Sequence, residues 1–220
     1  MIAEDLIQND IPVLHLSDDI SIAVTFFDDY KLHQVPVFEN SNFLGLIDDE
    51  VVLNASPKSK IKALKKHLRK EEISSEKNLF DVLHFFRHGN LSILPVVEKD
   101  NKYLGCIHDR VLLQKVCEIL KVENPGGVIH LQVRIIDYSL AQIAQIVEGN
   151  GARILSSLCL PNSSNSKLME LLIKINQDEL SGIIQTFQRY EYKIIASFHK
   201  NIQKQGLNDR LDSFIRYLNI

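Results

Sequence analysis

The sequence has few cysteines, and they form no pattern. Cys106, Cys117 and Cys159 are the only three in 220 residues, and none belongs to a Cys-x-x-Cys pair. An odd number at wide spacing argues against a disulfide framework and against a structural zinc site. We therefore predict three buried thiols in a reducing compartment.

Long apolar runs and an excess of one charge are also missing. No segment approaches the roughly 18 apolar residues that span a bilayer, and the acidic segment Met1–Asp10 lacks the parts of a signal peptide. The formal net charge of -3 argues against nucleic acid as the main partner, because phosphate binding draws on a cationic excess. We expect a cytoplasmic protein whose partners include neither nucleic acid nor a membrane.

The motifs of common catalytic sites are missing as well. The sequence contains no P-loop, no Gly-x-Ser-x-Gly, no His-Glu-x-x-His and no Rossmann fingerprint. His84 and His88 have the spacing of some metal sites, but no local acid or cysteine completes a ligand set. We therefore expect no enzyme, no catalytic residue and no metal. A Ser, His and Asp brought together only by folding is the alternative left open.

What the sequence does contain is a long repeat in its first half. Val35-Pro36 returns 59 residues later as Leu94-Pro95, and Gly45 returns 60 residues later as Gly105. A repeat of this length is a supersecondary unit that two copies complete together. Two such units facing each other create a cleft, and clefts of this kind bind small ligands.

Each copy of the repeat predicts the same order of elements. In the first copy, an extended lead-in at 11–16 precedes a helical stripe at 19–30, a β-branched strand, a polar turn and a second apolar strand. The acids of segment 48–50 then suit the start of a second helix. The unit is helix, strand, strand, helix.

This doubled pattern resembles the cystathionine β-synthase (CBS) domain over roughly residues 1–120. The resemblance implies a CBS pair, with repeat 1 at 1–58 and repeat 2 at 73–123. It also implies a cleft that senses an adenine nucleotide or a related ligand as small-molecule effector, with AMP, ATP and S-adenosylmethionine as candidates. Homodimerisation is expected, because paired CBS modules commonly associate.

A basic connecting helix is predicted at 59–72, between the two repeats. Its apolar residues fall on one face, and its cations fall on another. These cations are Lys62, Lys65, Lys66, Arg69 and Lys70. We interpret the charged face as solvated; a phosphate-attracting rim near the cleft and contact with an acidic partner are the alternatives.

The second half of the chain has a different pattern. After a linker at 124–127, the segment 127–200 predicts the order β-α-β-β-α-β, which is ferredoxin-like, so the fold class is α+β. The junction at Asp137 resembles an ACT domain, a module that commonly binds amino acids, although the proline and glycine of the family junction are absent here. A CBS pair followed by an ACT-like domain is similar to the acetoin-utilization regulatory protein family. Residues 203–220 predict an amphipathic helix that docks on its own chain or on a dimer mate.

The repeat departs from the family at the positions that hold nucleotide. CBS pairs that bind nucleotides usually carry Gly-h-h-Thr/Ser-x-x-Asp, where h is hydrophobic; here Asp48 and Val51 take the last two positions in the first copy, and His108 and Val111 in the second. An acid at the phosphate position repels an anion, and a ribose hydroxyl without a partner costs about 1 to 3 kcal/mol. We interpret His108 as a helix cap; contact of its protonated form with a phosphate is the alternative.

The resemblance to the two families, with neighbouring carboxylates as substitutes for the missing groups, gives one set of candidate ligand-binding residues. They are Val13, Val35, Pro36, Gly45, Asp48, Asp49, Leu94, Pro95, Gly105, His108, Asp109 and Asp137.

Two functions from different classes fit these features. The first is a non-enzymatic regulatory protein that senses a small molecule in the cleft of the CBS pair and signals by a conformational or oligomeric change. The alternative is a constitutive homo-oligomeric adaptor or scaffold with degenerate ligand sites and an unidentified protein partner.

Overall fold

The computed structural model describes residues 1–98 and 102–199 of the chain. It divides into two compact units, Met1–Lys115 and Val116–Ile220, with the division inside helix α4. The helix predicted at 203–220 lies outside the described residues, and so does most of the turn predicted between Glu98 and Lys102. The predicted mixture of helices and strands is confirmed, as an α+β fold.

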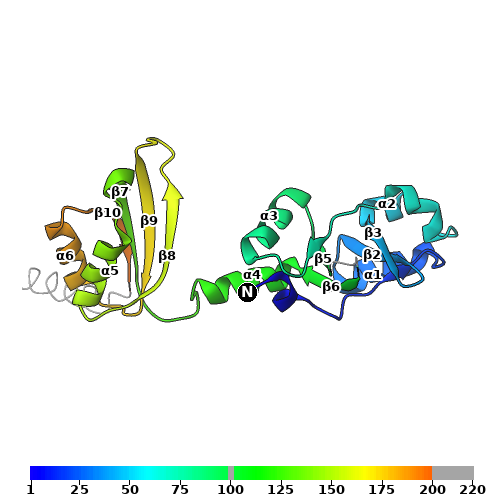
Figure 1. Ribbon diagram of the computed structural model, residues 1–220, viewed down its shortest axis with the longest axis horizontal. Coiled ribbons are helices and arrows are strands. Elements are labelled where there is room, and N and C mark those ends of the chain that lie inside the picture. Colours follow the sequence, from blue (N-terminus) through cyan, green and yellow to red (C-terminus); the bar gives the residue numbers. More distant parts are fainter. Residues whose placement is uncertain (99–101, 200–220) are drawn as a thin grey trace, which may run out of the picture. The chain divides into compact units, whose positions relative to one another are not determined.

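Unit 1 consists of two repeats with the same topology (Figure 1). In each repeat a short strand runs parallel to a middle strand, which pairs antiparallel with the third. Repeat 1 contains β1 (Leu14–His15), α1 (Ile20–Tyr30), β2 (Gln34–Glu39), β3 (Asn42–Asp48) and α2 (Asp49–Leu53). Repeat 2 contains β4 (Ile73–Ser74), α3 (Leu79–Gly89), β5 (Ile93–Val97), β6 (Tyr103–His108) and α4 (Asp109–Ile119). The predicted order of elements is confirmed in both copies.

The apolar pattern of the repeat explains these elements. Ile20, Ala23 and Phe27 are buried on one side of α1, at the spacing of an amphipathic helix. The middle strands are buried along nearly their whole length, as expected for strands covered on both faces. Asn78 caps α3 by accepting hydrogen bonds from the N–H groups of Phe80 and Asp81. One hydrophobic core therefore extends through both repeats.

Two segments, the N-terminal arm and the connecting arm, each pair with the repeat that they do not lead into. The N-terminal arm, residues 2–8, contains the 3-10 helix η1 (Ala3–Leu6) and pairs with repeat 2 through Gln8 and Cys106. The connecting arm, residues 60–69, contains the 3-10 helix η2 (Ile61–His67) and pairs with repeat 1 through Leu46 and Arg69. Each repeat is thus completed by the segment that leads into the other.

A glycine in each repeat makes this exchange sterically possible. Gly45 has φ +145°, and a Cβ built on it would lie 2.2 Å from the carbonyl oxygen of Arg69. Gly105 has φ +150°, and its Cβ would lie 2.4 Å from Ile7. Both backbone conformation and space therefore require glycine at the repeated position.

The connecting segment differs from the predicted helix over 59–72. Only Ile61–His67 is helical, as a 3-10 helix, and Leu68 begins an extended stretch with ψ 133°. The cause is the backbone pairing of Arg69 with Leu46, with N–H to carbonyl distances of 2.8 Å in both directions. The lysine-rich pattern is helical in period, but this pairing with β3 ends the helix.

The prediction of three buried thiols is wrong for one of them. Cys106 is buried in β6, Cys117 is half-buried in α4, and Cys159 is exposed. Burial raises the pKa of the Cys106 thiol to about 12, so that it stays protonated and unreactive at neutral pH. Cys159 is exposed because it lies on β8, an edge strand of unit 2.

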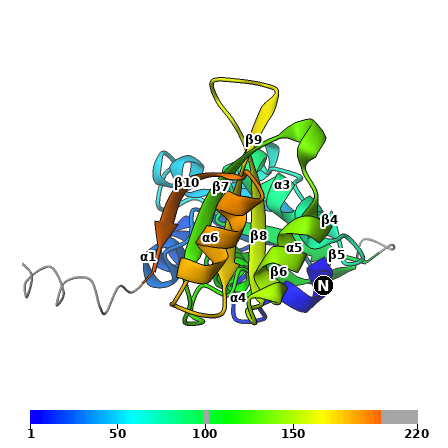
Figure 2. The same cartoon turned by 90° about the vertical axis from the view of Figure 1, so that its left-hand side faces the viewer.

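Unit 2 contains a four-stranded antiparallel sheet in the order β10-β7-β9-β8. Helices α5 and α6 cover one face of this sheet (Figures 1 and 2). The elements are β7 (Val128–Arg134), η3 (Ile135–Asp137), α5 (Leu140–Gly149), β8 (Ile154–Pro161), β9 (Leu168–Ile175), α6 (Ser181–Arg189) and β10 (Lys193–Phe198). The predicted ferredoxin-like order is confirmed. Across the described parts of both units, none of the helices has the length and apolar character needed to cross a membrane.

We predict that Gly45→Ala destabilises unit 1 by about 3 kcal/mol, because the added methyl group meets the Arg69 carbonyl and the backbone is strained. Gly149→Ala is the matched control, since a Cβ at the end of α5 meets nothing within 4 Å. That change is expected to be neutral or slightly stabilising. Urea unfolding followed by circular dichroism measures both, and equal stability of the two variants would contradict the requirement for glycine.

Candidate functional site

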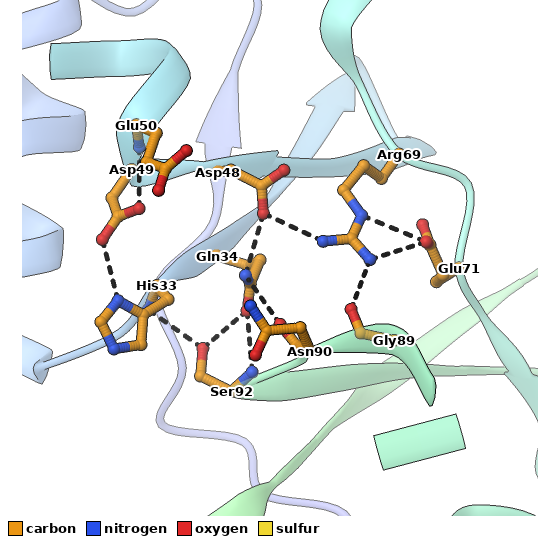
Figure 3. Close-up of polar contacts among 10 residues, drawn as sticks. All are labelled: His33, Gln34, Asp48, Asp49, Glu50, Arg69, Glu71, Gly89, Asn90 and Ser92. Carbon is orange, nitrogen blue, oxygen red and sulfur yellow. Dashed lines mark hydrogen bonds and ion pairs between the residues drawn. The ribbon is translucent and has the colours of Figure 1, made fainter. Parts of the chain in front are cut away.

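A pocket of about 490 Å³ lies where the two repeats of unit 1 meet. Its residues come from the starts of β2 and β5, from the starts of α2 and α4, and from the connecting arm. They are His33, Gln34, Asp48, Asp49, Glu50, Val51, Arg69, Asn90, Leu91, Ser92 and Asp109. Figure 3 shows the polar contacts on one side of this junction.

Gln34 joins the two repeats at the base of the pocket. Its side chain, on a residue only 3% exposed, accepts hydrogen bonds from the N–H and the hydroxyl of Ser92 at 2.8 and 2.9 Å. Its amide nitrogen donates to Asp48 at 2.9 Å, and the Ser92 hydroxyl oxygen accepts from the His33 N–H at 3.0 Å. A buried amide without these partners would be unstable, so the network holds the repeats in register.

Arg69 lines the pocket from the connecting arm, and Figure 3 shows its contacts. Its guanidinium donates to Asp48 at 3.2 Å, to Glu71 at 2.7 Å and to the Gly89 carbonyl at 2.7 Å. The hydrogen bond to Glu71, together with the charge of Asp48, raises the pKa of Arg69 against the opposing effect of burial. The arginine therefore stays charged and ties the end of β3 to the end of α3.

The other carboxylates of the pocket lie at the starts of two helices. Asp49 accepts from the Glu50 N–H at 2.7 Å and contacts the His33 ring at 2.9 Å. Asp109 accepts from the Arg110 N–H at 2.6 Å. With Asp48 and Glu50, four carboxylates line the pocket against one permanent cation, which is itself bound to two acids. The lining therefore disfavours anions and favours cations.

His108 occupies in repeat 2 the position that Asp48 occupies in repeat 1. The Arg110 N–H, which also donates to Asp109 at 2.6 Å, donates to the His108 Nδ1 atom at 3.1 Å. The histidine therefore caps the first turn of α4, which confirms the capping interpretation. The two copies of the motif position thus differ in role: one binds the connecting arm and the other caps a helix.

The structure places the predicted site residues of unit 1 in different surroundings. Asp48, Asp49 and Asp109 line the pocket between the repeats. The strand residues of the set are buried in the sheets, Val13 is half-buried before β1, and His108 caps α4. These strand residues are Val35, Pro36, Gly45, Leu94, Pro95 and Gly105. Most of the set therefore belongs to the scaffold around the pocket.

Asp137 belongs to unit 2 and lies apart from this group. Its exposed side chain forms an ion pair with Arg134 and borders a pocket of unit 2, of about 530 Å³. Burial, together with the charge of Asp137, raises the pKa of Tyr192, which lines the same pocket. The predicted set thus covers positions in two separate units.

Reasoning from the sequence missed Gln34 and Ser92, and it interpreted Arg69 as part of a solvated face, with a rim near the cleft as the alternative. One signal for Ser92 is the repeat itself, because His33 and Ser92 are 59 residues apart and bond to each other. When two copies of a repeat face each other across a two-fold axis, equivalent positions close to that axis lie next to each other. Arg69 stands between half-buried Leu68 and exposed Lys70, and the helical period of the segment assigned it to the charged face. Among the described residues, no group of three or more His, Cys, Asp or Glu side chains is arranged to hold a metal ion.

The family model of the CBS domain matches residues 3–58 and 72–118. These two segments are tandem CBS domains. CBS domain pairs are ligand-sensing regulatory modules, and the pocket described above lies between the two members of this pair. All residues of the pocket except Arg69 lie within the two matched segments.

Several solved structures are similar to this chain. A CBS domain pair/ACT domain protein from Thermotoga maritima is 19% identical, with a TM-score of 0.47 over 54% of this chain and 98% of that chain. The CBS domains of a transcriptional regulator from Streptococcus pneumoniae are 17% identical, with a TM-score of 0.46 over 52% and 98%. CBSX2 in complex with AMP is 18% identical, with a TM-score of 0.44 over 54% and 97%.

We predict that Arg69→Met destabilises unit 1 by about 2 kcal/mol, because Asp48, Glu71 and the Gly89 carbonyl each lose a charged donor. Arg87→Met on the exposed part of α3 is the matched control and is expected to change stability by less than about 0.5 kcal/mol. Chemical denaturation measures both. Equal stability of the two variants would show that Arg69 does not hold the junction.

Proposed function

We propose that this protein is a non-enzymatic regulatory sensor whose CBS pair binds an adenosine-containing ligand in the pocket between its repeats. The observation that carries the proposal is this pocket, which is built from both repeats and from the connecting arm. Its volume of about 490 Å³ falls within the range of small-molecule sites, about 300 to 1,000 Å³. Val51 and Leu91 supply apolar surface for a neutral part of the ligand.

The charge of the lining selects among the candidate ligands. AMP and ATP would place phosphate groups beside Asp48, Asp49 and Glu50, whose negative charge opposes them. S-Adenosylmethionine instead carries a sulfonium, an ammonium and a carboxylate group on an adenosine body, so that its net charge is positive. We therefore propose S-adenosylmethionine, or a ligand of the same charge, ahead of adenine nucleotides.

A bound cation would act on the contacts that join the repeats. Asp48 bonds to Arg69 on one side and to Gln34 on the other. A ligand cation that competes with Arg69 for this carboxylate would release the Arg69 side chain from the end of β3, while the backbone pairing of Arg69 with Leu46 is kept. A ligand shifts an equilibrium between two arrangements only by its different affinity for them, and this competition supplies such a difference.

We predict that S-adenosylmethionine binds about tenfold more tightly than S-adenosylhomocysteine, a difference of about 1.4 kcal/mol. The two molecules share the adenosine body, and only the first carries the sulfonium charge. AMP and ATP are expected to bind more weakly than either. Isothermal titration calorimetry on the full chain, supported by the shift of the melting temperature, measures the order.

Asp49→Asn is expected to reduce the preference for the sulfonium, because it removes one lining carboxylate. Asp28→Asn, at an exposed position near the end of α1, is the matched control and should leave the preference unchanged. Tighter binding of AMP than of S-adenosylmethionine would contradict the charge assignment. No heat and no shift in melting temperature with any of the four compounds would contradict the sensor itself.

One observation favours the second candidate, a constitutive scaffold. Four polar side chains of the pocket already form hydrogen bonds with one another. They are those of Arg69, Asp48, Gln34 and Ser92. A scaffold would keep the same oligomeric state with and without S-adenosylmethionine in sedimentation velocity. A ligand-dependent change would favour the sensor.

Homodimerisation is proposed for either function, and two exposed leucines mark the surface. Leu53 on α2 and Leu113 on α4 occupy the same position in the two repeats and are 67% and 65% exposed. A surface with internal two-fold symmetry suits self-association, because the same contacts can form in both directions.

We predict that Leu53→Glu and Leu113→Glu each convert the dimer to a monomer, because each buries a charge in an apolar contact. Gln114→Glu adds the same charge to the exposed neighbour of Leu113 and is expected to leave the dimer intact. Sedimentation equilibrium distinguishes the two states. Dimers of unchanged strength in both leucine variants would place the interface elsewhere.

A further inference from the structure

A second pocket of unit 1, of about 530 Å³, lies against the connecting arm. Residues from the start of β3, from η2 and from the extended stretch after it form its lining. They are Phe43, Leu44, Lys65, Leu68, Lys70 and Glu72. None of them lines the pocket between the repeats, so the two pockets are separate.

The extended part of the connecting arm forms the wall between the two pockets. Successive side chains of an extended segment point to opposite sides. Arg69 accordingly lines the pocket between the repeats, whereas Leu68 and Lys70 line the second pocket. The wall is fixed in place, because Arg69 pairs with Leu46 in both directions and rests on Gly45.

One side of the second pocket is apolar and aromatic. Phe43 is held by Phe38, at 5.7 Å between ring centroids, and by Tyr103, which stacks on it at 5.6 Å and 28°. Leu44 and Leu68 pack against the core beside it. A ring supported in this way is a firm surface for a flat apolar group.

The other side of the pocket is basic. Lys65 forms an ion pair with Glu39 at 2.9 Å, and this bond lowers the pKa of the glutamate. Lys70, in contrast, has no ion-pair partner within residues 1–98 and 102–199, and the one lining carboxylate belongs to Glu72. Because Lys65 is already paired with Glu39, Lys70 is the ammonium group of the lining that remains for a ligand anion, with Glu72 as the neighbouring carboxylate.

The basic character is not part of the repeated scaffold. The N-terminal arm holds the equivalent place on repeat 2, where Gln8 pairs with Cys106 as Arg69 pairs with Leu46. That arm carries Glu4 and Asp5 and no lysine. Since the fold forms equally with an acidic arm, the lysines beside Phe43 are not needed to build it.

We propose that this second pocket binds an aromatic anion, with the ring against Phe43 and the anionic group beside Lys70. The class is a flat apolar body that carries a carboxylate or a phosphate. Ammonium groups attract the anion, and the apolar wall removes the ring from water. This site is distinct from the cleft proposed above for a cationic ligand, and it neither requires nor excludes that ligand.

The test uses phenyl phosphate as the probe and the full chain as the protein. Binding is followed by the shifts of backbone amide signals in nuclear magnetic resonance, at millimolar probe. Lys70→Gln is expected to weaken binding about fivefold, and Phe43→Leu to weaken it similarly through the lost ring. Lys62→Gln, an equal loss of charge on the same arm but outside the lining, is the matched control and should change affinity by less than twofold.

Inorganic phosphate and phenol separate the two parts of the ligand, and each is expected to bind at least tenfold more weakly than phenyl phosphate. The melting temperature of each variant checks that it is folded. Shifts that centre on residues 43, 44 and 68–72 and are lost in Lys70→Gln support the site. No binding, equal loss in Lys62→Gln, or phosphate alone binding as well as phenyl phosphate would each overturn it.

Discussion

The close approach of two backbone segments at glycine is the constraint on which unit 1 depends. At Gly45 the carbonyl of Arg69 takes the space of a side chain, and at Gly105 Ile7 does the same. This approach lets each arm pair with the repeat that it does not lead into. It therefore joins two repeats, neither of which is complete alone. The shared core and the pocket between the repeats both follow from it.

The position of the arm also decides the chemistry of the module. Because Leu46 holds the backbone of Arg69, the guanidinium enters the junction and neutralises Asp48, an acid at the position where a nucleotide-binding CBS pair usually has a hydroxyl. The same backbone register sends Lys70 to the opposite side. One short stretch therefore supplies Arg69 to one pocket of unit 1 and Lys70 to the other.

The regular parts of the fold could be predicted from the sequence, and the irregular parts could not. Alternation, apolar runs and helical stripes predicted the strands and the two α-helices of unit 2, because these patterns report which face is buried, whereas the 3-10 helix Ile135–Asp137 was not predicted. The stripe at 59–72 was misleading, since pairing with β3 overrides it after His67. Of the candidate site, the acids at motif positions were found, whereas Gln34, Ser92 and Arg69 meet only through contacts between distant segments. Local patterns carry no information about such contacts.

The exchange of arms also sets an order for folding. The connecting arm pairs with a strand of the repeat that precedes it, so repeat 1 can be completed as soon as Arg69 has been made. The N-terminal arm is made first, but its partner Cys106 lies near the end of unit 1. Contacts between segments far apart in the sequence form late, because the closing of a long loop costs entropy before the contact stabilises the chain. Of this module, the segment that is made first is therefore expected to pair last.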